Sequence, residues 1–250
     1  MSNGESDKWK EAMGKEMSAL HENGTWELVN LPKNAKPIQC KWVYRIKENP
    51  DGSVDKYKAR LVIKGFNQRK GIDYSVTFSP VVKWETIRSV ISVAAKEKMY
   101  MTQFDVSTAF LYGDLEEIIY MKQPEGFEDG TNRVCKLKKS LYGLKQAPRC
   151  WNRRFGKFLS NQGFQASKED PCLYVKKEKK GKMILVLYVD DGLVTATNEE
   201  ELKNFLQALR KEFSITVSVA HHYLCLEINI QTSGQVKISQ EAYARKLLKC

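Results

Sequence analysis

The hydrophobic positions of this chain follow two different periods. Between residues 6 and 21, 84 and 95, and 199 and 213, apolar side chains recur every three or four residues, which predicts three amphipathic helices. Acidic side chains at 199–201 favour a helix N-terminus there. Pro148 at a first turn and Gly163 after the last one predict another helix over 148–161, and a short helix is expected from Gln240.

Short apolar runs between these helices predict β-strands. The first two strands are expected at 40–46 and 57–64, with a turn over 49–52. Further strands are expected at 101–106, on both sides of 179–182, and at 224–230 and 235–238 around a turn at 232–234. Helices and strands that alternate irregularly favour the α+β class, and 250 residues suffice for one domain or two closely packed lobes.

The segment 183–194 carries the most informative pattern. An apolar run reaches Asp190 and Asp191, continues through Gly192 and becomes apolar again. This pattern predicts a β-hairpin that turns at Asp191-Gly192 and carries both carboxylates at its tip. Adjacent like charges repel, and a hard cation such as Mg²⁺ would remove that repulsion. Asp-Asp-Gly is also an ordinary turn sequence, so a metal site and a plain turn both remain open here.

Charge and cysteine spacing narrow the functional classes. Forty-one Lys and Arg against 30 Asp and Glu give a net charge of +11, which fits a polyanionic partner such as nucleic acid and a merely soluble basic surface equally well. A polar N-terminus and short apolar runs predict neither a secretory signal nor a membrane span. The six cysteines lack any C-x-x-C pair and are expected to be reduced thiols of an intracellular protein.

A third carboxylate, Asp105, closes the predicted strand 101–106. A charge buried at the end of an apolar strand is unfavourable unless it is paired or binds a metal. Asp105 and Asp190 could therefore bridge two Mg²⁺ ions about 3.5–4 Å apart, the arrangement used for in-line phosphoryl displacement, with Asp191 as a weaker ligand or a tuning charge. A helix-capping or turn aspartate at position 105 is the structural alternative.

Eight segments of the chain together carry a family resemblance. They are 41–44 (KWVY), 58–66 (KARLVIKGF), 78–82 (FSPVV), 103–106 (QFDV), 109–113 (AFLYG), 120–127 (YMKQPEGF), 140–149 (SLYGLKQAPR) and 188–191 (YVDD). Taken together, these segments resemble the reverse transcriptase domain of copia-type LTR retrotransposons. They occur in the family's order between about residues 9 and 248.

The resemblance implies a right-hand polymerase fold of fingers, palm and a partial thumb within one reverse transcriptase domain, residues 1–250. The expected parts are an N-terminal helix and fingers (1–98), palm (99–122), a fingers/palm loop (123–148), palm (149–230) and the start of the thumb (231–250). Such a domain would add dNTPs to a primer 3′-hydroxyl on an RNA or DNA template, using two Mg²⁺ ions, with Mn²⁺ as a substitute. It would belong to a Pol polyprotein with integrase and RNase H, and would act in the cytoplasm, a virus-like particle or the nucleus.

The resemblance also assigns roles to individual residues. Asp105, Asp190 and Asp191 would be the catalytic, metal-binding carboxylates of the palm. The triphosphate of the dNTP would be bound by the fingers-hairpin cations Lys47, Arg60 and Lys64. Phe110 would be an aromatic steric gate that excludes a ribose 2′-hydroxyl. The loop at Tyr142 and Gly143 would let the backbone approach the nucleotide closely. The template and primer would be contacted by Lys138, Lys139, Lys145, Arg149 and Cys225.

The chain departs from the family pattern near its C-terminal end. Cys225 replaces a glycine of the hairpin that would hold the primer terminus, where a side chain would crowd the primer. Segments expected for a protease, an integrase or an RNase H are not seen, and residue 250 falls where the thumb would continue. A nucleic-acid-binding relic without catalysis and a host-adopted interaction module are therefore the alternatives to an active polymerase.

Overall fold

The computed structural model describes residues 3–49, 53–178, 181–231 and 235–248. The chain forms two compact units: unit 1 comprises Met1–Ser79 and Thr108–Arg154, and unit 2 comprises Pro80–Ser107 and Phe155–Cys250. These units are defined by contact density and not by function, so the expected fingers, palm and thumb boundaries stay predictions. The predicted turns at 49–52 and 232–234, and residues 179–180 between two predicted strands, fall wholly or partly outside the described residues.

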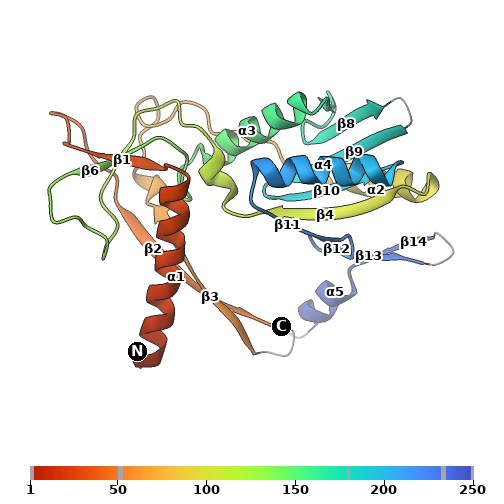
Figure 1. The fold of residues 1–250 in the computed structure, drawn as a ribbon, viewed down its shortest axis with the longest axis horizontal. Helices are drawn as coiled ribbons and strands as arrows, with labels where there is room; N and C mark the ends of the chain where they lie inside the picture. The colour runs from red at the N-terminus through yellow and green to blue at the C-terminus, as the bar shows by residue number, and fades with distance from the viewer. Residues whose placement is uncertain (1–2, 50–52, 179–180, 232–234, 249–250) are drawn as a thin grey trace. The chain divides into compact units, whose positions relative to one another are not determined.

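Unit 1 consists of a long helix, two small sheets and connecting loops (Figure 1). Helix α1 runs from Asn3 to Glu22. Strands β2 (Cys40–Glu48) and β3 (Val54–Ile63) form a long antiparallel hairpin. The second sheet has the order β1-β6-β5, with β1 at Trp26–Val29, β5 at Tyr120–Met121 and β6 at Val134–Leu137. Short 3₁₀ turns occupy Gly65–Asn67 and Ala109–Tyr112.

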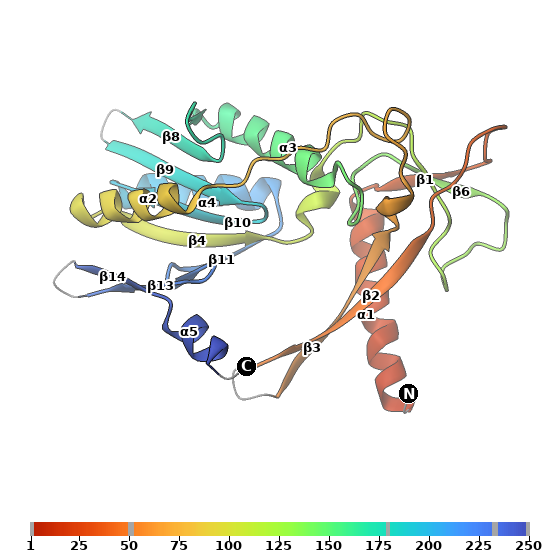
Figure 2. The same ribbon diagram turned by 180° about the vertical axis from the view of Figure 1, so that it is seen from behind.

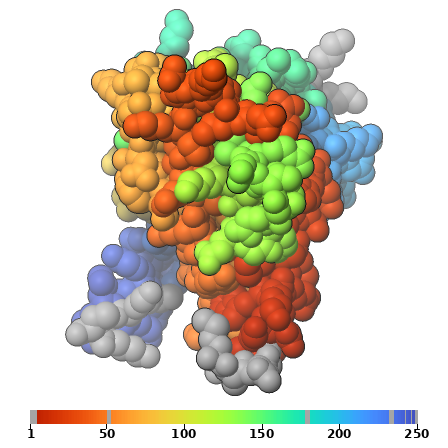
Figure 3. Space-filling model, turned by 90° about the vertical axis from the view of Figure 1, so that its left-hand side faces the viewer, coloured from red at the N-terminus to blue at the C-terminus, as the bar shows by residue number. Residues whose placement is uncertain are grey.

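The core of unit 1 lies where α1, the base of the hairpin and the small sheet meet. Leu20 of α1, Leu61 of β3 and Met121 of β5 are buried there in one hydrophobic cluster. The loop between β5 and β6 covers part of this unit, and its Glu125 carbonyl accepts a hydrogen bond from Trp42 Nε1 at 3.0 Å. Figure 3 shows the loop in yellow-green over the red and orange N-terminal segments.

Unit 2 is built on a six-stranded antiparallel sheet with the order β11-β4-β10-β9-β8-β7. A separate three-stranded sheet has the order β12-β13-β14. The strands are β4 (Tyr100–Val106), β7 (Gln165–Ala166), β8 (Leu173–Glu178), β9 (Gly181–Tyr188), β10 (Asp191–Ala196), β11 (Ile215–Val219), β12 (His222–Tyr223), β13 (Leu226–Ile230) and β14 (Val236–Ser239). The helices are α2 (Trp84–Lys96), α4 (Glu199–Glu212), α5 (Glu241–Leu247) and the end of α3 (Ala147–Asn161), which begins in unit 1.

Successive side chains along the strands of the large sheet point to opposite faces, and both faces carry buried apolar side chains. On one face, α2 packs Ile87 and Ile91 into a cluster with Met101 and Ile184. On the other face, the ring of Phe104 lies 6.1 Å from that of Phe155 in α3, in an aromatic group that extends to α4. Figures 1 and 2 show α2 and α4 on opposite faces. Strand β4, an interior strand of this sheet, is therefore packed on both faces.

The long periodic segments form the expected elements. The helices expected at 84–95, 148–161 and 199–213 occur as α2, α3 and α4, with ends that differ by one residue, and all pairs of described strands are antiparallel, as expected for an α+β fold. Strands β1, β5, β6, β7, β11 and β12 were not expected, because two to five residues are too few to show a period. The described cysteines carry free thiols, and no described helix is long and apolar enough to cross a membrane.

Candidate active site

The hairpin that carries the adjacent aspartates turns earlier than expected. Tyr188 and Asp191 pair across β9 and β10, so the two-residue turn is Val189-Asp190 and not Asp191-Gly192. Val189 has φ of +57°, the left-handed conformation that the first position of such a turn requires and that a β-branched residue rarely adopts. The predicted turn position was therefore wrong, and only Asp190 of the two acids lies in the turn.

Gly192 belongs to a strand because of the side chain beside it. It pairs with Phe104 of β4, and a Cβ at position 192 would lie 2.0 Å from Cζ of that ring. Phe104 is buried, so its ring cannot move aside easily. The glycine that suggested a turn from sequence instead lets an aromatic ring pack across the sheet.

The third predicted acid lies beside the other two. Asp105 on β4 is the register partner of Asp191 on β10, and the Val106 amide donates a hydrogen bond to the Asp190 carbonyl at 2.9 Å. Asp105 is exposed, so the argument from a buried charge does not hold for it, and its place within a strand does not fit the capping or turn alternative. Pairing of β4 with β10 thus brings together the three predicted carboxylates.

Electrostatics at this end of the sheet favour a bound cation. The pKa of Asp191 is raised to about 6, chiefly by burial and then by the negative charges of Asp190 and Asp105. Hard divalent ions would offset the repulsion among the three carboxylates, and such oxygen donors are the ligands that Mg²⁺ prefers. Within the described ranges, no group of three or more His, Cys, Asp and Glu side chains is arranged so that it could hold a metal ion.

A small cavity of about 70 Å³ adjoins the acids. Asp105 and Asp191 line it together with Gln103, whose buried Oε1 has no hydrogen-bond partner among the described residues. Tyr223, also in the wall, is buried and donates through its hydroxyl to the carbonyls of Asp191 (3.2 Å) and Val186 (3.4 Å). Nothing in the sequence pattern singled out Tyr223, because only tertiary packing of β12 against the large sheet brings its hydroxyl to the Asp191 backbone.

Three of the predicted nucleotide-binding residues form a stack within unit 1. The Arg60 guanidinium lies over the Tyr142 ring, 4.6 Å from its centroid, and the Phe110 ring lies 4.9 Å from the same ring. Cation–π contact with a tyrosine restrains the guanidinium without neutralising its charge. Arg60, the predicted triphosphate ligand, and Phe110, the predicted steric gate, therefore both contact the Tyr142 ring.

Gly143 is explained by packing within the protein. Its φ is +93°, and a Cβ there would lie 2.1 Å from the Ile63 carbonyl oxygen. Gly65 approaches equally closely, since its Cβ would lie 1.9 Å from the Gly143 oxygen. The glycine pair lets two backbone segments touch, while close approach of a nucleotide to Gly143 stays a prediction.

The other lysine and arginine residues predicted to bind the nucleotide or the nucleic acid differ in their contacts within the protein. Lys47 is exposed on β2, and Lys64 donates to Gln39 Oε1 at 2.8 Å. Lys138 pairs with Glu27 at 2.8 Å and Lys139 pairs with Asp114. Lys145 lies 4.7 Å from the Tyr74 ring centroid, and Arg149 donates to the Phe78 carbonyl at 3.5 Å. The four residues expected to contact phosphates, Lys138, Lys139, Lys145 and Arg149, thus all have partners within unit 1.

Cys225 lies in unit 2, at the turn between β12 and β13, with an exposed side chain. The residue with positive φ in this turn is Leu224, at +56°. The backbone at position 225 therefore does not require glycine.

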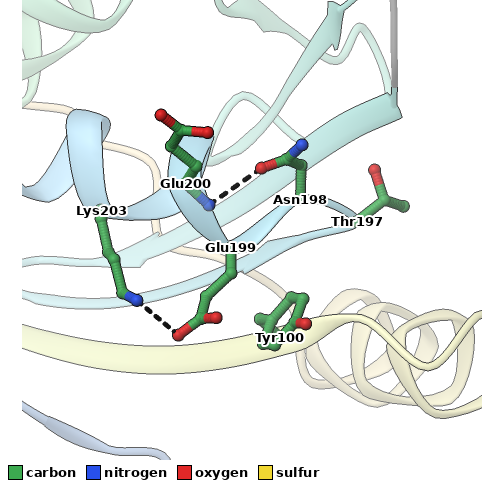
Figure 4. Close-up of a pocket in the computed structure, with 6 residues that line it drawn as sticks. All are labelled: Tyr100, Thr197, Asn198, Glu199, Glu200 and Lys203. Atoms are coloured by element: carbon green, nitrogen blue, oxygen red, sulfur yellow. Dashed lines mark hydrogen bonds and ion pairs between the residues drawn. The ribbon is translucent and has the colours of Figure 1, made fainter.

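A separate hollow of about 430 Å³ opens at the N-terminus of α4 (Figure 4). Its polar groups are paired with one another. Asn198 Oδ1 accepts from the Glu200 and Glu201 amides, and Lys203 pairs with Glu199 at 2.8 Å. These contacts are those of a capped helix N-terminus and need no ligand.

Sequence comparisons match most of the chain to known proteins. The profile of the reverse transcriptase (RNA-dependent DNA polymerase) family matches residues 23–250. The retrovirus-related Pol polyprotein from transposon TNT 1-94 of Nicotiana tabacum is 45% identical over 99% of this chain, and that from transposon RE1 of Arabidopsis thaliana is 42% identical over 97%. The chain spans 19% and 17% of their lengths. An apo telomerase structure from Candida tropicalis, truncated from its C-terminal domain, matches with a TM-score of 0.47 and 12% identity over 92% of this chain and 60% of that one.

A family profile that covers nine-tenths of the sequence, together with relatives above 40% identity, leaves one assignment. The chain belongs to the reverse transcriptase (RNA-dependent DNA polymerase) family, among the copia-type retrotransposon Pol polyproteins.

Proposed function

We propose that the chain is an RNA-directed DNA polymerase domain that adds deoxynucleotides to a primer 3′-hydroxyl on an RNA or DNA template. One observation carries the proposal: Asp105 and Asp191 are register partners on β4 and β10, and Asp190 lies in the adjoining turn. Burial, and then the charges of Asp190 and Asp105, raise the pKa of Asp191. Three carboxylates at one end of a sheet suit a divalent cation.

The proposed architecture is a right hand. Residues 1–98 and 123–148 form the fingers with their connecting loop, 99–122 and 149–230 the palm, and 231–250 the start of the thumb. This division assigns the acids to the palm and the β2-β3 hairpin to the fingers. Membership of a family whose relatives are Pol polyproteins supports it, as does a mixed α and β fold with antiparallel sheets.

Asp105, Asp190 and Asp191 are the proposed metal ligands. Two Mg²⁺ ions held there, or Mn²⁺ in their place, would supply charge neutralisation at the attacking 3′-hydroxyl and the pyrophosphate leaving group. The chain's own contribution is positioning. Pairing of β4 with β10 fixes the two strands that carry the carboxylates, and the Tyr223 hydroxyl fixes the Asp191 backbone.

Cations and rings of unit 1 are proposed to bind the nucleotide. Arg60, Lys47 and Lys64 provide positive charge for the triphosphate, and Arg60 is the best prepared because the Tyr142 ring already restrains it. Phe110, in contact with the same ring, is the proposed barrier to a ribose 2′-hydroxyl.

Primer extension tests the proposal directly. Purified protein is expected to extend oligo(dT) on poly(rA) with dTTP and Mg²⁺. The variant Asp190→Asn should lose extension by about a thousandfold or more, because it removes a negative charge that would hold the cation needed to neutralise the transition state. Its template affinity, measured by fluorescence anisotropy, should stay within about twofold of the parent.

The variant Asp7→Asn serves as the control, since it removes an exposed carboxylate from α1 and should extend at the parent's rate. Extension by Asp190→Asn at the parent's rate would show that the metal-ligand assignment is wrong. Tight, salt-sensitive template binding by a parent that incorporates no nucleotide would instead favour the non-catalytic relic.

A further inference from the structure

Two glutamines of unit 1 are buried and face each other. Gln68 follows the 3₁₀ turn at Gly65–Asn67 and is 5% exposed, and Gln146 directly precedes α3 and is 1% exposed. Gln68 Nε2 donates a hydrogen bond to Gln146 Oε1 at 2.9 Å. Glutamine is seldom fully buried, because each donor and acceptor that leaves water must find a partner in the protein. The burial of this pair therefore depends on hydrogen bonds from neighbouring segments.

Every polar atom of the two side-chain amides has a partner. Gln68 Nε2 also donates to the Asp73 carbonyl at 3.4 Å, and its Oε1 accepts from the Lys145 backbone amide at 2.8 Å. Gln146 Nε2 donates to the Asp73 carbonyl at 3.0 Å and to Glu117 Oε2 at 3.2 Å. A backbone amide only donates and a carbonyl only accepts, so these partners fix the orientation of each glutamine amide. A network in which every group is satisfied holds its segments in one arrangement.

The network ends on the loop that carries Tyr142 and Gly143. Gln68 holds the Lys145 amide of this loop, and the Tyr142 carbonyl accepts a hydrogen bond from the Ile63 amide at 2.8 Å. Lys145 Nζ makes a further contact, to the Gln68 carbonyl at 3.4 Å. The loop is therefore fixed at both of its ends, and Gln68 supplies the contacts at one of them.

The Tyr142 ring links this loop to the proposed nucleotide site, because the Arg60 guanidinium lies over it and Phe110 contacts it. A shift of the loop would move the ring from under the guanidinium. We propose that Gln68 is a positioning residue for nucleotide binding, which acts by holding the Lys145 amide. This inference rests on the proposed function, which assigns Arg60 to the triphosphate.

Apolar packing alone would not do the same. Methionine is unbranched like glutamine, adapts to the space it is given and would fill position 68. It would leave the Lys145 amide and Gln146 Oε1 without their present partner, and an unpaired buried polar group is unfavourable. Glutamine at this position thus specifies where the loop lies, in addition to filling space.

Gln68→Met is the test variant. Nucleotide binding is measured as the Kd of dTTP in a complex with Mg²⁺, poly(rA) and an oligo(dT) primer that ends in a dideoxynucleotide, so that no chemistry is needed. The Kd is expected to rise by about tenfold, because an unpaired Lys145 amide frees the loop and Arg60 must be ordered again when the nucleotide binds. In primer extension the KM for dTTP should rise with it, while kcat stays within about twofold of the parent's, since Arg60 would contact the triphosphate in both the ground state and the transition state. Hydrogen–deuterium exchange of the Lys145 amide should become faster.

Gln123→Met is the matched control. The Gln123 amide donates to Asp129 Oδ1 at 2.8 Å and to the Arg133 carbonyl at 2.9 Å, and it accepts from the Asp129 amide at 2.9 Å. This variant therefore loses a similar set of hydrogen bonds in unit 1, outside the network of Gln68. It should melt at a lower temperature than the parent and bind dTTP with the parent's Kd. Gln68→Glu keeps an oxygen for the Lys145 amide, so its Kd should lie closer to the parent's than that of Gln68→Met, even though both are expected to melt at a lower temperature.

Three results would overturn the proposal. They are equal Kd values for dTTP in Gln68→Met and Gln123→Met, unchanged exchange of the Lys145 amide in Gln68→Met, and a further rise of the Kd when Gln68→Met is added to Arg60→Ala, since the effect should pass through the guanidinium. If the parent binds dTTP with the expected dependence on Gln68 but extends no primer, the polymerase function fails while the positioning role of Gln68 stands.

Discussion

At the scale of single residues, Gly192 shows how one missing side chain shapes the site. The variant Gly192→Ala should be destabilised by about 1–3 kcal/mol, because its Cβ would overlap the buried Phe104 ring. Denaturant unfolding followed by circular dichroism measures the loss. Gly156→Ala in α3 is the matched control, since the nearest atom to its Cβ is the Tyr174 hydroxyl at 3.4 Å, an ordinary contact. Equal stability of the two variants would contradict a packing role for Gly192.

Asp191 makes the stability of the folded protein depend on pH, and the direction of its pKa shift sets the sign of this dependence. Its pKa in the folded protein is about 6, above the ordinary value of 3.8, so folding disfavours its charged form. The resulting loss of stability is absent below about pH 4 and complete above about pH 6. Without divalent metal, Asp191→Asn should melt above the parent at pH 7.5, and the difference should disappear near pH 4. A difference that is the same at both pH values would exclude this origin, and added Mg²⁺ should raise the parent's melting temperature more at pH 7.5 than at pH 5.

At the scale of elements, the β12-β13 turn decides whether Cys225 impairs the protein. Leu224 holds the positive φ of this turn, so glycine at position 225 would relieve no backbone strain. Cys225→Gly should lower the free energy of unfolding by about 0.5–1 kcal/mol through added freedom of the unfolded chain, and primer extension should be unchanged. Cys225→Ala, which keeps the Cβ, is the control and should retain the parent's stability. Faster extension by the glycine variant alone would show that a side chain at this position crowds the primer.

The long elements were predictable and the short ones were not. Helices α2, α3 and α4 each bury a continuous apolar stripe, and such a stripe shows its period over three or four turns. Strands such as β5, β7 and β12 have two residues each, and they exist because a neighbouring strand offers hydrogen bonds. Pairing between distant segments has no local signal, so sequence patterns could not reveal them.

At the scale of the whole molecule, neither unit is one continuous stretch of sequence. Unit 2 takes its interior strand β4 from Pro80–Ser107 and the strands on both sides of it, β11 and β10, from Phe155–Cys250. The three acids belong to unit 2, and the predicted nucleotide-binding residues belong to unit 1.

The sequence by itself determined the family, the α+β class, the three carboxylates and the excess of positive charge, because each is visible in residue identity or in a local period. Only the tertiary structure decided the rest. The turn lies at Val189-Asp190 because the Phe104 ring needs Gly192 within a strand. Asp105 is opposite Asp191, and Arg45 is opposite Lys58, because the register of the paired strands sets which residues face each other. Register depends on hydrogen bonds and packing between segments far apart in the chain, which hydrophobic periodicity along one segment does not specify.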